Sequence, residues 1–71
     1  MNAHALTALM SAIREHGSPT VRQALDWTVL DFLAAWADKI DDLEEFGECE
    51  IGARHTWHGN PVIVTLENGG N

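Results

Sequence analysis

The sequence has few of the residues that staple a small fold together. It contains one cysteine, Cys49, two prolines and no tyrosine in 71 residues. A single cysteine excludes an intramolecular disulfide and is typical of a free thiol in a reducing compartment, although a disulfide between two chains stays open. A chain of this length buries only about 60% of its unfolded surface. We therefore expect one marginally stable domain over residues 1–71 that would gain from forming a homodimer.

Long apolar runs and basic residues are also scarce. Residues 1–10 hold no lysine or arginine, so no signal peptide is expected, and no stretch reaches the roughly 18 consecutive apolar residues of a membrane span. These absences predict a cytoplasmic protein that does not enter a membrane. Four basic residues against 11 acidic ones give a net charge of −7. Because nucleic acids and anionic lipids repel such a chain, we expect neither as a direct partner.

Residues 2–16 have the pattern of a first helix. Asn2 can cap its start, and Gly17 fits the left-handed position that ends many helices. Small residues on the opposite face would allow close contact with a neighbour. The apolar residues at helical spacing are Leu6, Leu9, Met10 and Ile13.

A second helix is expected to begin near residue 18 and to run to about residue 46. Ser18 can cap it with Pro19 at the first helical position, and Thr20 with Gln23 forms an alternative capping box. A further capping signal leaves a break at residues 26–28 open. We favour one long helix, either bent or continuous.

On a helical wheel, this second segment separates an apolar arc from an acidic arc. The apolar arc holds Val21, Leu25, Val29, Phe32, Leu33, Trp36, Ile40, Leu43 and Phe46. The acidic arc holds Asp31, Asp38, Asp41, Asp42 and Glu45. Leu30 and Ala37 widen the apolar arc, which suggests more than one packing neighbour. We predict an oligomer interface formed by Val29, Leu30, Leu33 and Ala37.

After Gly47, which we expect to end the helix, the apolar period changes to two, and residues 50–57 and 62–67 are typical of two strands. Because Pro61 has no amide proton, a four-residue loop that pairs Trp57 with Val62 is favoured over a two-residue turn. This register puts Ile51, Ala53, Trp57, Val62, Val64 and Leu66 on the face that packs against the helices. It puts Arg54, Thr56, Thr65 and Glu67 on the other face. The predicted fold class is α+β, with two helices followed by an antiparallel hairpin (ααββ) and a flexible tail at residues 68–71.

Residues 38–50 form an acidic block with seven carboxylates and a single base, Lys39. Like charges one turn apart and anions near a helix C-terminus both cost stability. The block is either a solvated face that keeps the protein soluble or an electrostatic docking surface for a basic partner. Carboxylates one and two helical turns apart lie about 5–11 Å apart, comparable with backbone phosphates, so the docking surface can mimic a nucleic acid. Its acids are Asp38, Asp41, Asp42, Glu44, Glu45, Glu48 and Glu50.

Trp27 is the aromatic candidate for a binding surface. On a continuous helix it lies in the acidic arc, and exposed tryptophans are enriched among residues that dominate binding energy. The alternative is structural: Thr28 and Asp31 have the spacing of a capping box, and a helix break there would turn Trp27 into the core. The partner-binding residues that we predict are Trp27, Asp31, Asp38, Asp41, Asp42 and Glu45.

Cys49, His55 and His58 have a spacing that can suggest a metal site. Zinc takes four ligands, or three and a water, whereas His55 and His58 point to opposite faces of an extended strand. We expect no metal and no cofactor, and a small metal-binding domain is a weaker alternative. The chain has no glycine-rich phosphate loop, and nothing in the sequence orients Cys49 against a histidine. We therefore expect no enzymatic activity.

Together these features predict a small acidic protein–protein interaction module. The expected form is an inhibitor or regulator of the kind made by phages and mobile elements, which docks its acidic helix face on a basic surface of another protein, including surfaces that bind nucleic acid. One alternative is an assembly subunit that homo-oligomerises through the apolar helix face. Another is a regulator whose hairpin edge, near Arg54, adds to a partner's sheet.

Overall fold

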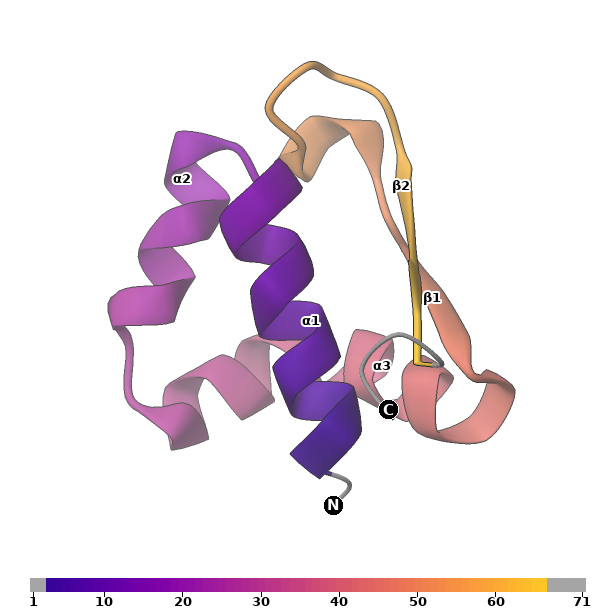
Figure 1. Ribbon diagram of the computed structural model, residues 1–71. Coiled ribbons are helices and arrows are strands. Elements are labelled where there is room, and N and C mark those ends of the chain that lie inside the picture. Colours follow the sequence, from indigo (N-terminus) through magenta and orange to yellow (C-terminus); the bar gives the residue numbers. More distant parts are fainter. Residues whose placement is uncertain (1–2, 67–71) are drawn as a thin grey trace.

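The computed structural model describes residues 3–66. The elements are helices α1 (Ala3–His16), α2 (Pro19–Arg22) and α3 (Val29–Phe46), 3₁₀ helices η1 (Gln23–Asp26) and η2 (Ala53–His55), and strands β1 (Glu48–Ile51) and β2 (Val62–Thr65). Figure 1 shows α1 in the centre, α2 on one side, the hairpin on the other and α3 across the bottom. The predicted α+β class, helices followed by an antiparallel hairpin, is confirmed. The predicted cap Asn2, the strand residue Glu67 and the predicted tail at residues 68–71 lie outside the described residues.

The first helix is confirmed, with Leu9 and Ile13 fully buried, but the prediction for Gly17 is wrong. Gly17 does not have a positive φ; it donates its N–H to the Ile13 carbonyl (2.8 Å) and pairs with Thr56 in an isolated bridge. A Cβ at this position would lie 2.5 Å from the Ile13 carbonyl oxygen. Glycine is therefore needed here for close packing.

The single long second helix is also wrong, because the chain breaks where the alternative placed the break. Ser18 caps α2 by accepting the Val21 N–H (3.3 Å), and the helical turn tightens into η1 before an extended residue, Trp27. Thr28 then caps α3, its hydroxyl accepting the Asp31 N–H at 3.1 Å. The second cap satisfies an amide at the new N-terminus and lets α3 leave in another direction.

The apolar arc of the wheel is only partly buried. Phe32, Ile40 and Leu43 are in the core, whereas Val29 and Phe46 are 54% and 66% exposed. The break before residue 28 and a kink at Trp36 (φ −116°, ψ 20°) rotate the segments relative to one another, so one straight wheel does not describe them. Gly47 ends α3 as predicted, with a left-handed φ of 77°.

The hairpin exists, but its predicted register is wrong. Val62 pairs with Ile51 and not with Trp57, which lengthens the loop to residues 52–61. Residues expected in the first strand instead form η2 and a turn, so Arg54 is not on a strand. The full set of pairs is Glu48 with Thr65, Cys49 with Val64, Glu50 with Ile63, and Ile51 with Val62.

The long loop is held by the junction between α1 and α2. The Ser18 N–H donates to the His55 carbonyl (2.9 Å), and the Trp57 N–H donates to the His16 carbonyl (2.8 Å). Thr56, expected on the outer face, is 7% exposed and donates its hydroxyl to the Asn60 carbonyl at 2.7 Å. Trp57, expected on the inner face, is 55% exposed. The two backbone hydrogen bonds join segments far apart in sequence.

The core lies between α1, the α2–η1 segment, α3 and the inner side of the hairpin. It consists of Ala5, Leu9, Ile13, Val21, Ala24, Phe32, Ile40, Leu43, Cys49, Ile51 and Val64. Over residues 3–66, no helix combines the length and the apolar character that a membrane crossing requires.

Candidate docking surface

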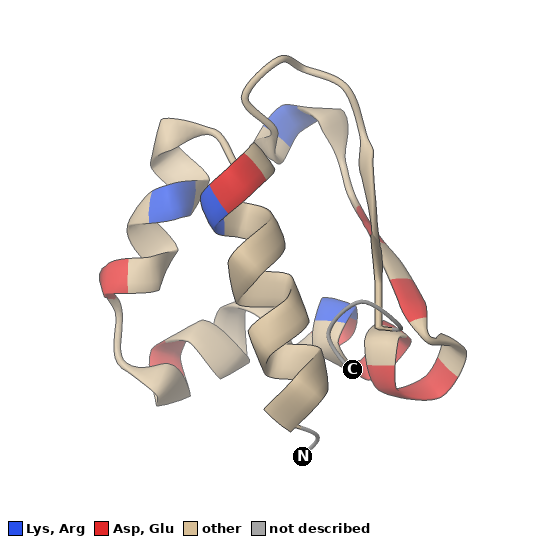
Figure 2. Ribbon diagram, in the orientation of Figure 1, with Lys and Arg blue, Asp and Glu red and all other residues tan. Residues whose placement is uncertain are grey.

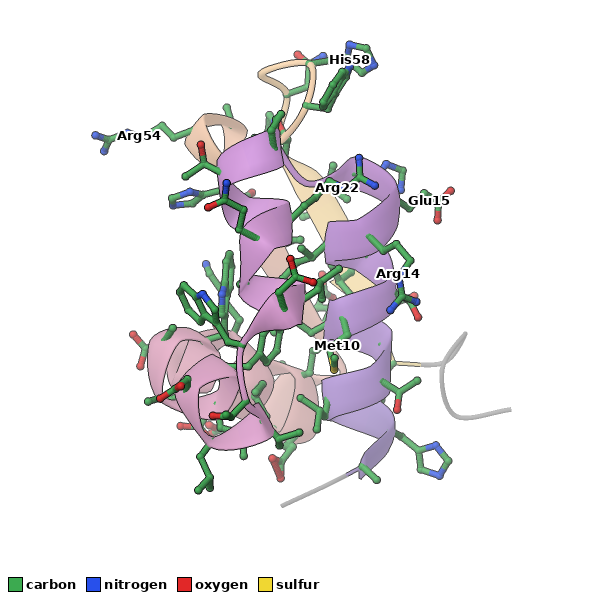
Figure 3. The ribbon with its side chains drawn as sticks, turned by 90° about the vertical axis from the view of Figure 1, so that its left-hand side faces the viewer. Met10, Arg14, Glu15, Arg22, Arg54 and His58 are labelled. Carbon is green, nitrogen blue, oxygen red and sulfur yellow. The ribbon has the colours of Figure 1, made fainter. Side chains whose placement is uncertain are left out.

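Most of the acidic residues are concentrated at one end of the molecule (Figure 2). Acidic residues gather over the C-terminal half of α3 and over β1, with Lys39 as the base among them. The three arginines come from other elements, Arg14 from α1, Arg22 from α2 and Arg54 from η2. Figure 3 shows Arg54 pointing away from Arg14 and Arg22, with His58 near the tip of the loop. The arginines therefore do not neutralise the acidic end.

The carboxylates of the acidic block are largely exposed and form no ion pair with any residue of the described range, 3–66. All are exposed except Asp42, which is half-buried. Within residues 3–66 the structure has one ion pair, Glu15 with His16 at 3.8 Å, and it requires a protonated histidine. Like charges that nothing neutralises produce a strong local field, which raises the rate at which a basic partner is encountered.

The structure groups most, but not all, of the predicted binding residues. Asp38, Asp41, Asp42 and Glu45 follow the kink at Trp36 and span the last turns of α3. Asp31 lies in the first turn, about 20 Å from Glu45 along the helix axis at 1.5 Å per residue. Asp31 therefore contributes to the start of α3 and not to the acidic end.

Trp27 lies at the rim of a groove and not in the core. It is 49% exposed, so the expectation that a helix break would bury it is wrong, because the extended backbone at this residue leaves the indole outside the packed helices. The groove has a volume of about 470 Å³ and brings Trp27 together with Trp36, Asp38 and His55. It is completed by Thr20, Val21, Gln23, Ala24, Ala35 and Lys39.

The sequence placed Trp36 in the apolar arc and His55 among residues considered for a metal, and it did not predict that the two share a groove. Trp36 stacks on Phe32 with ring centroids 6.3 Å apart, and His55 meets it edge-on at 5.9 Å. The sequence offers no local signal for this contact, since His55 lies 19 residues after Trp36 and its carbonyl is held by the Ser18 N–H at the start of α2.

The predicted oligomer face is solvent-accessible. Leu30 is 78% exposed, Val29 and Ala37 are also exposed, and Leu33 is partly buried. Leu33 and Ala37 line a shallow depression of about 360 Å³ together with Asp41. The apolar patch is therefore continuous with the acidic end of α3.

The residues considered for metal binding do not converge. Over residues 3–66, no three or more histidine, cysteine, aspartate or glutamate side chains form a group that can hold a metal ion. Cys49 is a free, buried cysteine of β1, and His58 lies in the loop with its ring 6.4 Å from that of Trp57. Burial raises the pKa of the Cys49 thiol; the charge of Lys39 lowers this pKa and that of Asp42 raises it.

A second groove, of about 390 Å³, separates the open edge of β2 from α1. Arg54 does not line this groove, so the predicted association of Arg54 with a free strand edge is wrong.

No family model matches the sequence, and no curated protein or solved structure matches it either.

Proposed function

We propose that the protein is an acidic interaction module that docks the C-terminal half of α3, with the start of β1, on a basic surface of another protein. The observation that carries the proposal is the acidic block itself: seven carboxylates and one lysine, with no ion pair to these carboxylates within residues 3–66. Such an arrangement costs stability in the helix and at its C-terminus. A binding role would offset this loss of stability, because a complementary basic partner relieves the repulsion between the carboxylates.

The class of partner that fits best is a surface that binds nucleic acid. Asp38, Asp41 and Glu45 are three and four residues apart on one helix, which spaces successive carboxylates by about 5–6 Å. Backbone phosphates are spaced on the same scale, so a groove lined with arginine and lysine can accept either. Blocking such a groove would make the protein an inhibitor or regulator, as expected of a small phage or mobile-element product.

The test compares two charge reversals of equal size. Asp41→Lys with Glu45→Lys removes the centre of the acidic end, and Glu15→Lys with Asp26→Lys makes the same change in net charge elsewhere on the exposed surface. After the partner has been captured from the host and identified by mass spectrometry, its affinity for each variant is measured by calorimetry at two salt concentrations. We expect the first variant to bind at least about 10-fold more weakly and the second to change by less than about 3-fold. Equal effects of the two variants would overturn the proposal.

The exposed apolar patch favours a second candidate, an assembly subunit that pairs through Val29 and Leu30, which are 54% and 78% exposed. Sedimentation over a range of concentrations tests this candidate directly. Self-association that is lost in Leu30→Gln would support it, whereas a stable monomer at all concentrations would eliminate it.

A further inference from the structure

The groove beside the acidic end combines side chains that rarely share an exposed surface. Trp27 comes from the break after η1, Trp36 and Asp38 come from α3, and His55 comes from η2. Trp27 keeps 49% of its surface exposed, although burying an indole is one of the largest apolar gains available to a small protein. The indole is therefore accessible to a binding partner.

Local contacts hold the backbone at Trp27 in place. The Trp27 N–H donates to the Ala24 carbonyl (3.2 Å), and the next residue, Thr28, caps α3. These two local contacts fix the backbone on both sides of the indole. The opposite wall is also held, since Trp36 is packed between Phe32 and His55. The backbone at Trp27 and the ring of Trp36 are thus held in place.

The chemistry of this groove matches one kind of side chain. A guanidinium group is planar and weakly hydrated, so it stacks on indole faces and can form two parallel hydrogen bonds with a carboxylate. Asp38 supplies a carboxylate at the groove, and Val21, Ala24 and Ala35 supply apolar walls for the methylene stem. An anion would be repelled by Asp38 and by the acidic residues that follow it. A purely apolar side chain would gain no electrostatic interaction with Asp38.

Lys39 is the one cation in the groove and would compete with an incoming charge. It is half-buried, and its charge also acts on Cys49 in β1, together with that of Asp42. Removing the lysine charge should make the groove more receptive to a cation.

We propose that the groove formed by Trp27, Trp36, Asp38 and His55 receives an arginine side chain of the partner protein. The inference rests on the proposed function, since it assigns one contact within the same docking surface. It makes the groove the specific element of the interaction, while the acidic end supplies long-range attraction.

The experiment titrates the intact protein with N-acetyl-arginine amide at constant ionic strength and follows the indole N–H resonances of its three tryptophans by NMR. N-acetyl-citrulline amide is the neutral isostere, and Trp57, which does not line the groove, is the internal control. We expect saturable shifts at Trp27 and Trp36, an affinity for the citrulline compound at least about 5-fold weaker, and little change at Trp57.

Three variants sharpen the result without touching the core. Asp38→Asn should weaken arginine binding by about 3-fold or more, and Lys39→Gln should strengthen it, while Glu45→Gln removes a charge outside the groove and should have a smaller effect than Asp38→Asn. Equal shifts with citrulline, equal shifts at Trp57, or equal effects of Asp38→Asn and Glu45→Gln would overturn the inference. Failure here would leave salt-dependent docking through the acidic end intact. Conversely, failure of the docking proposal would show in the partner affinities of the charge reversals and not in this titration.

Discussion

At the scale of single residues, Gly17 joins three parts of the fold. It ends α1, precedes the cap of α2 and pairs with Thr56 of the long loop. A methyl group there would collide with a backbone oxygen and also approach the side chains of Ile13 and Arg22 at 3.1 and 3.3 Å. A backbone carbonyl cannot rotate away as a flexible side chain can.

Gly17→Ala should therefore lower the free energy of unfolding by about 1–3 kcal/mol, the usual cost of overpacking a tight contact. Gly52→Ala is the matched control, because no heavy atom lies within 4 Å of a Cβ at that position and its φ of −63° suits any residue. The control should change stability by less than about 1 kcal/mol. Urea denaturation of both variants provides the measurement, and a harmless Gly17→Ala would contradict the packing described here.

Cys49 makes the stability of the fold depend on pH in the alkaline range. Burial raises the pKa of the folded thiol, so the folded state holds its proton at pH values where the unfolded state has lost it. The stability that depends on the protonated thiol is fully present below the ordinary pKa of a thiol. It is lost as pH rises from there through the higher pKa of the folded state. We expect this loss in urea denaturation at increasing pH, and we expect Cys49→Ala to reduce it. Few other groups titrate in this pH range, because the chain has no tyrosine and one lysine. Identical pH profiles of stability for the unmodified protein and Cys49→Ala would contradict the prediction.

At the scale of elements, α3 carries charges that oppose its own dipole at one end and support it at the other. Glu45 lies in the last turn, three and four residues after Asp42 and Asp41, where the helix C-terminus disfavours anions. Asp31 lies in the first turn, where an anion is favoured. Replacing an acidic residue by lysine should thus have opposite effects on stability at the two ends of α3.

Glu45→Lys should raise the free energy of unfolding by about 0.5–1 kcal/mol, since it removes two repulsions, adds a favourable pair with Asp41 and complements the dipole. Asp31→Lys makes the same charge change in the same helix and should lower stability by a similar amount. Thermal unfolding at low salt measures both. If both variants were equally stabilised, relief of overall net charge and not the position within α3 would explain the effect.

The elements that could be predicted from the sequence are those with local signals. Ser18 with Pro19, Thr28 with Asp31, and Gly47 each act on amides or carbonyls within a few residues, so the ends of the helices follow from short stretches of chain. The prediction of one long helix was wrong because both halves have helical apolar periodicity, which hides the break between them.

The hairpin register could not be predicted in the same way. Alternation and the missing amide proton of Pro61 favoured a four-residue loop, but the segment at residues 52–57 forms contacts with His16 and Ser18 instead. These two backbone hydrogen bonds are available only when α1 and α2 are in place, whereas the Thr56 hydroxyl bonds to Ala53 and Asn60 within the loop itself. The same packing brings His55 to Trp36, which is why the outward carboxylates were predicted and the groove was not.

At the scale of the whole molecule, a net charge of −7 on 71 residues is concentrated at one end, while three arginines lie elsewhere. The folded state holds these carboxylates closer together than the unfolded chain does, so their repulsion opposes folding. A basic partner feels the same field as attraction. Salt screens both interactions, with a Debye length of about 10 Å at 0.1 M.

Sodium chloride should therefore change stability and partner binding in opposite directions. Between low and physiological ionic strength, we expect the midpoint of thermal unfolding to rise and the affinity for a basic partner to fall, because one screened interaction is repulsive and the other attractive. Asp41→Lys with Glu45→Lys should flatten both dependences more than Glu15→Lys with Asp26→Lys, although the two variants have the same net charge. Calorimetry across a salt series measures both quantities on one set of samples. A midpoint that falls with salt would mean that attraction dominates within the fold, and the acidic end would then no longer be an uncompensated charge that a partner can relieve.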